Sequence, residues 1–174
     1  IPAASLLDKA PLTWRLMRLL PALIDQPHFE PLRRFLTNDT DLRKRYQLSE
    51  RLADLFDQYQ VYRADWLEDW AAGRHQLRNV RGEAKPLTPA NCWQAELWRA
   101  LLLDVGEQGM AQSRAGVHQR FIERITSLHE APAGLPPRVI VFGISSLPAQ
   151  ALEALAGLAR FSQVLLCVHN PCRH

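Results

Sequence analysis

Apolar residues recur at helical spacing through roughly the first 130 positions of the chain. Leucines between residues 11 and 25 lie three or four positions apart, which predicts an amphipathic helix with Pro11 in its first turn that Pro21 ends or kinks. Pro27 and Pro31 then indicate a loop and a short helix. Three residues could cap the longer helix that follows, namely Asp39, Thr40 and Asp41.

The most regular pattern runs from Leu48 to Trp70 in steps of 4, 3, 4, 3, 4 and 4 residues. At about 100° per residue these positions share one face, so we expect one helix that buries this face and ends near Gly73. The face consists of Leu48, Leu52, Leu55, Tyr59, Tyr62, Trp66 and Trp70. We expect its aromatic side chains to pack in the core rather than to stack on a ligand.

Two more helices are predicted before the character of the sequence changes. Residues 74–91 are basic and lack periodicity, which predicts a surface loop. A helix resumes at Trp93 and should end at Gly106 and Gly109, and another should cover residues 113–130. The apolar positions expected to be buried are Trp93, Leu97, Leu101 and Val105 in the first, and Val117, Phe121, Ile125 and Leu128 in the second.

The end of the chain has a different pattern, with a proline-rich linker at 131–137 followed by strand, helix and strand. A strand–helix–strand segment of this length indicates a βαβ unit and therefore a parallel sheet. The expected fold class is α/β but mostly helical. A helical subdomain would cover residues 1–132, and a partial parallel-sheet core would cover residues 133–174.

Composition limits the possible classes of function. Apolar residues make up 47% of the chain, enough for a buried core, and the net charge of +3 permits a nucleic-acid partner without requiring one. Three cysteines do not form a disulfide framework and favour the reducing cytoplasm. No apolar run reaches the roughly 20 residues that span a bilayer. Because the chain begins with Ile1 rather than Met, we expect it to be a fragment of a longer protein.

The motifs of nucleotide hydrolysis are missing from the sequence. A phosphate-binding loop places glycines before Lys and Ser or Thr, so that backbone N–H groups surround the phosphates, and no such string occurs. An ATPase also needs acids at the end of a hydrophobic strand to hold magnesium, but Gly143 and Ile144 follow the strand at 138–142. We therefore expect no catalytic site and no cofactor.

Two other strings have simpler interpretations than the sites they resemble. "FGISSLP" approximates a nucleophile elbow, yet Leu147 replaces its second glycine, so Ser145 or Ser146 is expected to cap a helix with Pro148 in its first turn. Four possible zinc ligands lie near the end of the chain: Cys167, His169, Cys172 and His174. Their spacing is not that of common zinc sites, so we expect core packing and a turn instead of a metal.

Acidic residues occupy the side of the 48–70 helix opposite its apolar face, at Asp54, Asp57 and Asp65. One interpretation is a solvated surface. The other is a surface that reads unpaired bases, because carboxylates accept hydrogen bonds from their amino and imino groups. Basic clusters could meet phosphates or simply be solvated; they are Arg33–Arg34, Arg43–Lys44–Arg45, and Arg74, Arg78, Arg81 and Lys85.

Several strings together resemble a known family. They are "PLTWRLMRLLP", "ADLFDQYQVYRADWL", "QAELWRALL", "RAGVHQRFIERI", "PRVIVFGISSLP" and "NPCRH". The chain resembles, over nearly its whole length, the RecC family of gamma chains of bacterial exodeoxyribonuclease V, the RecBCD complex. The resemblance implies a superfamily 1 helicase-like fold whose ATPase motifs have decayed, in which this chain supplies a helical subdomain and part of the sheet.

The resemblance also implies partners and a function. RecC works with the RecB helicase-nuclease and the RecD helicase at double-strand DNA ends, and its channel for single-stranded DNA recognises the Chi sequence. The chain would then be a non-catalytic, cytoplasmic DNA-binding module in repair by homologous recombination. The alternative is a scaffold that docks RecB without reading bases.

Five residues match the family's Chi-binding positions. Asp54 and Asp57 would accept hydrogen bonds from base edges, and Arg63 and Arg114 would hold bases or phosphates. Leu55 would pack against a base, which conflicts with its place on the apolar face of the helix, so only one of these two expectations can hold.

Overall fold

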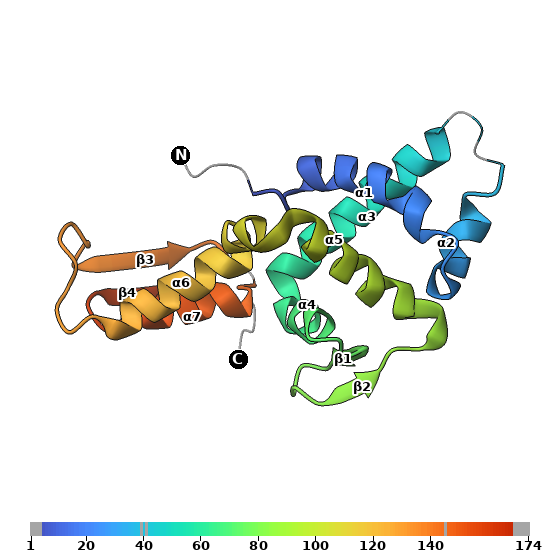
Figure 1. Cartoon of the computed structure of the whole chain (residues 1–174). Coiled ribbons are helices and arrows are strands. Elements are labelled where there is room, and N and C mark those ends of the chain that lie inside the picture. Colours follow the sequence, from blue (N-terminus) through green and yellow to red (C-terminus); the bar gives the residue numbers. More distant parts are fainter. Residues whose placement is uncertain (1–4, 39, 41, 145, 169–174) are drawn as a thin grey trace. The chain divides into compact units, whose positions relative to one another are not determined.

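The computed structural model describes residues 5–38, 40, 42–144 and 146–168, and the chain divides into two compact units, residues 1–115 and 116–174. The first unit contains α1 (Lys9–Leu23), the 3-10 helix η1 (Pro27–Phe29), α2 (Glu30–Phe35), α3 (Arg43–Tyr62), α4 (Ala64–Ala71), β1 (Gln76–Arg78), β2 (Ala84–Pro86), η2 (Pro89–Asn91) and α5 (Cys92–Ala111). The second contains most of α6 (Arg114–Ser127), then β3 (Arg138–Phe142), α7 (Ala149–Leu158) and β4 (Gln163–Cys167). Figure 1 shows these elements along the chain.

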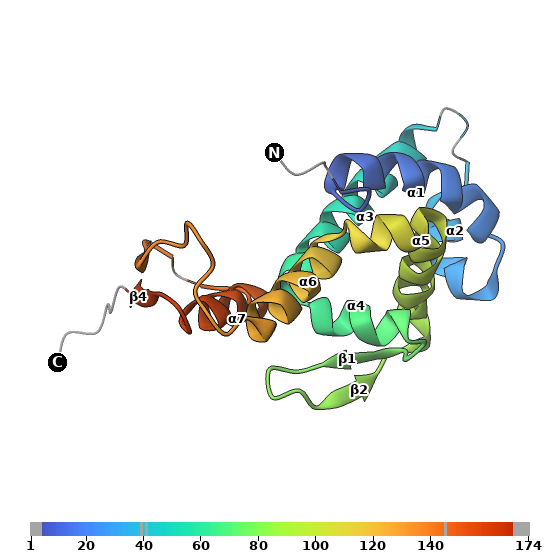
Figure 2. The same ribbon diagram turned by 60° about the vertical axis from the view of Figure 1, so that its left-hand side comes forward.

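The core of the first unit lies between α1, α3, α4 and α5. Leu12 and Leu16 of α1 are fully buried as expected; Leu20 is buried as well, whereas Leu19 and Leu23, also expected on this side, are only partly buried. Helices α1 and α3 lie side by side in both views (Figures 1 and 2). Phe56 of α3 stacks on Trp98 of α5 with ring centroids 5.5 Å apart, which joins the two sides of this core.

The segment from Leu48 to Trp70 forms two helices and not the single helix expected. Arg63 leaves the helical conformation, with φ −139° and ψ 43°, and α4 begins at the next residue. The chain changes direction at this break, from α3 into α4 (Figure 1). Trp66 and Trp70 of α4 then pack edge-on against Tyr59 of α3. The expected end of this region near Gly73 is confirmed, since α4 stops at Ala71.

The buried face of α3 is also turned by about 100°, or one residue, from the expected face. Its buried residues are Ser49, Leu52, Ala53, Phe56 and Gln60. Tyr62, expected in the core, is 61% exposed, and Leu55 is half-buried. The expectation assumed one straight helix through Trp70. Because the helix breaks at Arg63, the apolar residues of α3 and α4 do not have to share one face. The capping prediction was wrong for Thr40, because Leu42 holds the N-cap position; Asp39 and Asp41 lie outside the described residues.

Residues 74–91, expected to be a loop, form a β-hairpin and a short helix. β1 and β2 pair antiparallel, with Gln76 opposite Pro86 and Arg78 opposite Ala84. At the tip the Asn79 side-chain oxygen accepts from the N–H groups of Arg81 and Glu83 at 2.9 and 3.0 Å. The expectation failed because side chains of α4, described below, hold this hairpin, and they leave no periodic signal in the strands.

The α5 helix confirms Leu97, Leu101 and Val105 as buried positions, and Trp93 packs against the core. Its expected end is confirmed in part, since the backbone leaves the helical conformation at Gly106, but a further helical segment runs through Gly109 to Ala111. Gly106 interrupts it locally with φ 66° and ψ −178°, a left-handed conformation that favours glycine.

The second unit confirms the predicted βαβ arrangement. β3 and β4 pair in parallel, with Val139 opposite Val164 and Phe142 opposite Cys167. Ile125 of α6 is buried, while Val117, expected to be buried, is 51% exposed. The expected serine cap was wrong for Ser146, because Pro148 holds the N-cap position of α7; Ser145 lies outside the described residues.

Contacts of α6 with α7 explain why α6 belongs to the second unit. A Cβ placed on Gly157 would lie 2.9 Å from Ile125 Cγ2, so glycine permits the close approach of the two helices. Arg160 donates to the carbonyl oxygens of Ile125 and Thr126 at 2.8 and 2.9 Å, groups left without helical partners at the end of α6. The division between the two compact units therefore falls near the start of α6.

One face of the β3–β4 sheet is open within the second unit. Ile140, Phe142 and Leu165 are 60%, 81% and 38% exposed, and the pairing register places Ile140 beside Leu165 on the same face. Parallel sheets are normally covered on both faces.

No helix among the described residues is long and apolar enough to cross a membrane.

Candidate nucleic-acid interface

Polar residues line one side of α3 beside α1. Tyr46, Glu50, Asp54 and Asp57 are spaced by four, four and three residues, so they lie on one side of the helix. This side is next to the buried face, where α1 packs. We call Glu50, Asp54 and Asp57, with the residues that pair with them, the α3 polar face.

Asp54 is paired with Lys9, at the first turn of α1. The Lys9 Nζ lies 2.6 Å from Asp54 Oδ1, and the two side chains are 50% and 47% exposed. The hydrogen bond to Asp54 raises the pKa of Lys9 above its usual value. Both groups stay open to solvent, so this ion pair contributes little to stability and can be exchanged for another partner.

Asp57 is paired with Arg114, the first residue of α6. Arg114 Nη2 lies 2.8 Å from Asp57 Oδ1 and 3.5 Å from Asp8 Oδ1. The contact with Asp57 lacks hydrogen-bond geometry, and that buried oxygen makes no hydrogen bond among the described residues. This oxygen is enclosed, so a ligand can reach it only where Arg114 moves aside.

A buried glutamine fixes the segment that carries Asp8 and Lys9. Gln60 of α3, 5% exposed, donates from Nε2 to the carbonyl oxygen of Leu7 at 2.8 Å. Leu7 is itself 1% exposed, and the Ser5 N–H donates to Asp8 Oδ2 at 2.9 Å. Because these contacts hold the chain just before α1 against α3, Asp8 and Lys9 have defined positions at the α3 polar face.

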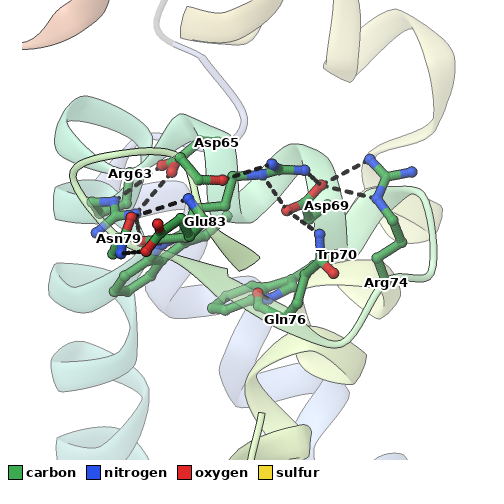
Figure 3. A network of polar contacts seen from close by, with 11 residues as sticks. Arg63, Asp65, Asp69, Trp70, Arg74, Gln76, Asn79 and Glu83 are labelled. Carbon is green, nitrogen blue, oxygen red and sulfur yellow. Dashed lines mark hydrogen bonds and ion pairs between the residues drawn. The ribbon is translucent and has the colours of Figure 1, made fainter. Parts of the chain in front are cut away.

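Arg63 belongs to a different network, shown in Figure 3. Its guanidinium donates to both carboxylate oxygens of Asp65, at 3.0 and 2.8 Å, and lies 3.7 Å from the centre of the Trp66 ring. It also donates to the Arg78 carbonyl oxygen, as does Trp66 Nε1 at 2.9 Å. Three kinds of contact thus hold Arg63 between α4 and the hairpin.

Asp69 is the centre of this network (Figure 3). Its carboxylate is 2% exposed and accepts hydrogen bonds from Arg78 Nε, Arg74 Nε and Gln76 Nε2 at 2.7, 2.9 and 2.8 Å. Hydrogen bonds, first of all from Arg78, hold the pKa of Asp69 well below its usual range. Trp70 Nε1 donates to the Gln76 carbonyl oxygen at 2.9 Å, so both tryptophans of α4 are bonded to β1.

The structure therefore brings together three of the five residues expected to bind DNA. Asp54, Asp57 and Arg114 converge on the α3 polar face, Arg63 is held by the Asp69 network, and Leu55 lies about 100° around the helix from Asp54. Sequence reasoning missed Asp8 and Lys9, because only the packing of α1 against α3 brings them here. Periodicity in the sequence contains no signal for that contact.

The described residues contain no group of three or more His, Cys, Asp or Glu side chains suited to a metal. Cys167 is exposed, and His169, Cys172 and His174 lie outside the described residues. The α3 polar face is a mixed-charge surface, with Glu50, Asp54 and Asp57 facing Lys9 and Arg114. Such a surface offers acceptors and donors to a polar ligand and is the feature that distinguishes the first unit.

A helical unit with a mixed-charge polar face, followed by a βαβ segment, defines the class of the molecule, and sequence comparison gives its family. The family model described as "RecC, N-terminal domain" matches residues 1–174, and the chain belongs to this family. A protein of Escherichia coli named "RecBCD enzyme subunit RecC" is 45% identical over 175 residues, which cover 100% of this chain and 15% of that protein. The chain thus spans less than a fifth of this relative's length.

Proteins of the same name from two other bacteria are also similar. The Haemophilus influenzae protein is 36% identical over 189 residues, which cover 99% of this chain and 17% of that protein. The Mycobacterium tuberculosis protein is 30% identical over 168 residues, which cover 92% of this chain and 14% of that protein. These relatives are named as subunits of the RecBCD enzyme.

Proposed function

We propose that the chain is a non-catalytic recognition module of a RecBCD enzyme, and that its α3 polar face reads bases of single-stranded DNA as Chi passes. The observation that carries the proposal is the convergence of Asp54, Asp57 and Arg114 on one accessible side of α3. Arg114 comes from a part of the sequence remote from the two acids, and each of the three matches a position that the family resemblance assigned to DNA.

Base reading suits the charge of this surface. Carboxylates accept from the amino and imino groups of unpaired bases, whereas they repel phosphates. Glu50, Asp54 and Asp57 outnumber Lys9 and Arg114, so the face favours selection among bases over tight binding of the backbone. Each mismatched base should then cost about 1–3 kcal/mol of binding free energy.

The ion pairs on this face are compatible with binding. The half-exposed pair of Asp54 with Lys9 costs little to exchange, because surface salt bridges contribute about 0–1 kcal/mol. A base that donates to Asp54 would replace Lys9 as the partner of this carboxylate. Arg114 would make the same exchange at Asp57, whose buried oxygen becomes accessible when the arginine moves aside.

The test is an Asp54→Asn, Asp57→Asn double variant of the whole subunit in its assembled enzyme complex. We expect Chi-dependent cutting to fall about tenfold or more. Each Asp offers two oxygens that accept from the N–H groups of a base, whereas each Asn offers one such oxygen and an NH2 group that donates. The matched control is Asp25→Asn, an exposed acid after α1. Unchanged Chi-dependent cutting in an intact double-variant complex would remove the base-reading role.

A docking role is the second candidate function, and the open face of the β3–β4 sheet favours it. Exposed Phe142 and Ile140 resemble the apolar centre of a protein interface rather than a solvated sheet. If this face docks the RecB subunit, Phe142→Ser should weaken association of the subunits while Asp54→Asn, Asp57→Asn leaves association unchanged. Normal association of the Phe142→Ser variant would exclude this role for the sheet.

The helicase-like origin of the second unit remains a proposal as well. β3 ends at Phe142 and is followed by Gly143 and Ile144, where an ATPase of this class carries acids. The sequence supports a decayed ATPase at this strand. A direct check is nucleotide binding by the whole subunit alone, which should not exceed that of a variant with Gly143→Ala.

A further inference from the structure

Two large aromatic side chains are exposed on the first unit and touch each other. Trp14 of α1 is 65% exposed and Tyr46 of α3 is 42% exposed. Their ring centroids are 6.0 Å apart, with planes inclined at 52°. Tryptophan is usually mostly buried, so a Trp–Tyr pair that keeps this much ring surface in water is an unusual feature of a helical surface.

The pair continues the α3 polar face along the seam between α1 and α3. Tyr46 lies eight residues before Asp54 on the same side of α3, which is about 12 Å along the helix. Trp14 lies five residues after Lys9 on the antiparallel α1. Because Lys9 contacts Asp54 and Trp14 contacts Tyr46, the two contacts follow one another along one seam.

We propose that Trp14 and Tyr46 form a stacking platform for an unpaired base of the strand whose other bases meet Asp54 and Asp57. The proposal rests on the function proposed above and adds a binding site to it. Aromatic rings stack on any base, since every base has a π-face, and each stacked base adds to the affinity without requiring positive charge.

The chemistry of the neighbouring residues explains why such a platform is needed. Glu50, Asp54 and Asp57 repel phosphates, so the backbone of a bound strand has to face away from α3 while its bases face the protein. In that orientation, ionic contacts with the backbone provide little affinity. Stacking on Trp14 and Tyr46 would supply it, and an extended strand of a few nucleotides covers the distance from the platform to Asp54.

The experiment combines protein variants with oligonucleotides that lack one base. The whole subunit, in its assembled enzyme complex, carries either Trp14 or Trp14→Ala, and binding is measured for single strands with an abasic site at successive positions. For the complex with Trp14 in place, we expect an abasic site at one position to weaken binding of the strand by about tenfold. Trp14→Ala should weaken binding of the intact strand similarly, and the same abasic site should then cost nothing more.

Conservative and matched variants complete the test. Trp14→Phe and Tyr46→Phe keep a ring and should retain most of the binding. Leu103→Ala removes a side chain that is 84% exposed on α5 and should leave binding unchanged. Additive losses from Trp14→Ala and every abasic site would overturn the platform, as would failure of the Trp14→Ala complex to assemble, which would assign the pair to a protein contact.

The outcome for the platform is separable from the outcome for base reading. If Trp14→Ala and one abasic site are coupled while Asp54→Asn, Asp57→Asn leaves sequence preference unchanged, the platform stands and base reading by the acids fails. If the acid variants change sequence preference while no abasic position is coupled to Trp14, base reading stands and the platform fails.

Discussion

The Arg78 guanidinium donates to both carboxylate oxygens of the buried Asp69, through Nε at 2.7 Å and Nη2 at 3.0 Å, and so joins β1 to α4. Without this contact the buried carboxylate of Asp69 would keep only Arg74 as a charged partner. The hairpin and α4 therefore stabilise each other, and the free energy of that contact should depend on the charge of one carboxyl group.

The Asp69→Asn variant should lose about 2 kcal/mol of unfolding free energy at pH 7, because hydrogen bonds to a charged group are lost. The folded-state pKa of Asp69 lies below its unfolded value near 3.9, so the carboxylate stabilises the fold above that pH, and the effect is lost as pH falls toward the folded-state pKa. Urea unfolding at pH 7 and pH 3 should therefore show a smaller difference between variant and unchanged chain at pH 3. An equal difference at both values would contradict this account.

Removal of the Gln60 side chain should loosen the segment before α1. Gln60→Ala leaves the Leu7 carbonyl oxygen without its buried donor and should cost about 1–3 kcal/mol of unfolding free energy. The matched control is Gln58→Ala, two residues away and exposed, which should change stability by less than about 0.5 kcal/mol. Hydrogen exchange at residues 5–9 should accelerate only in the first variant, and equal exchange in both would argue against the contact.

Gly157→Ala should destabilise the second unit. Alanine is the better helix former by about 1 kcal/mol, but its Cβ would lie 2.9 Å from Ile125 Cγ2, and such overpacking costs about 1–3 kcal/mol. Thermal unfolding should show a net loss. Ala156→Gly, at an exposed position of α7, measures the propensity effect alone and serves as the reference. A Gly157→Ala chain more stable than the original would mean that α6 and α7 separate easily.

Arg63 and Arg114 should differ in what they do for stability. Arg63→Gln removes a cation–π contact and a two-oxygen contact with Asp65, so we expect a loss of about 1–2 kcal/mol in urea unfolding. Arg114→Gln removes a half-exposed ion pair and should cost under about 1 kcal/mol. The reverse order would show that Arg114 holds the fold and Arg63 is the freer residue.

The periodic pattern of apolar residues correctly predicted those helices and strands in which buried side chains recur at the repeat of the backbone. The apolar sides of α1 and α5 and the βαβ segment were correct because each side chain there faces one continuous core. Residues 74–91 were wrong because their order comes from Asp69 and the two indole N–H groups of α4, which lie elsewhere in the sequence. Specific polar contacts of this kind have no period.

The residues of the candidate site likewise fall into those that the sequence predicted and those that it did not. Family resemblance pointed to Asp54 and Asp57, and the helical period places both on one side of α3. Lys9 and Trp14 were not expected there, because their place depends on how α1 packs against α3. The position of Arg63 was missed because a single residue outside the helical region moves it to another surface.

The interruption at Arg63 separates what a continuous helix would couple. In an unbroken helix, an inserted or deleted residue rotates everything beyond it by about 100°. The break at Arg63 lets α4 take a direction that α3 does not set, so Asp69 meets its arginines while Asp54 and Asp57 stay beside α1. The surface proposed to contact bases and the anchor of the hairpin are therefore carried by different helices.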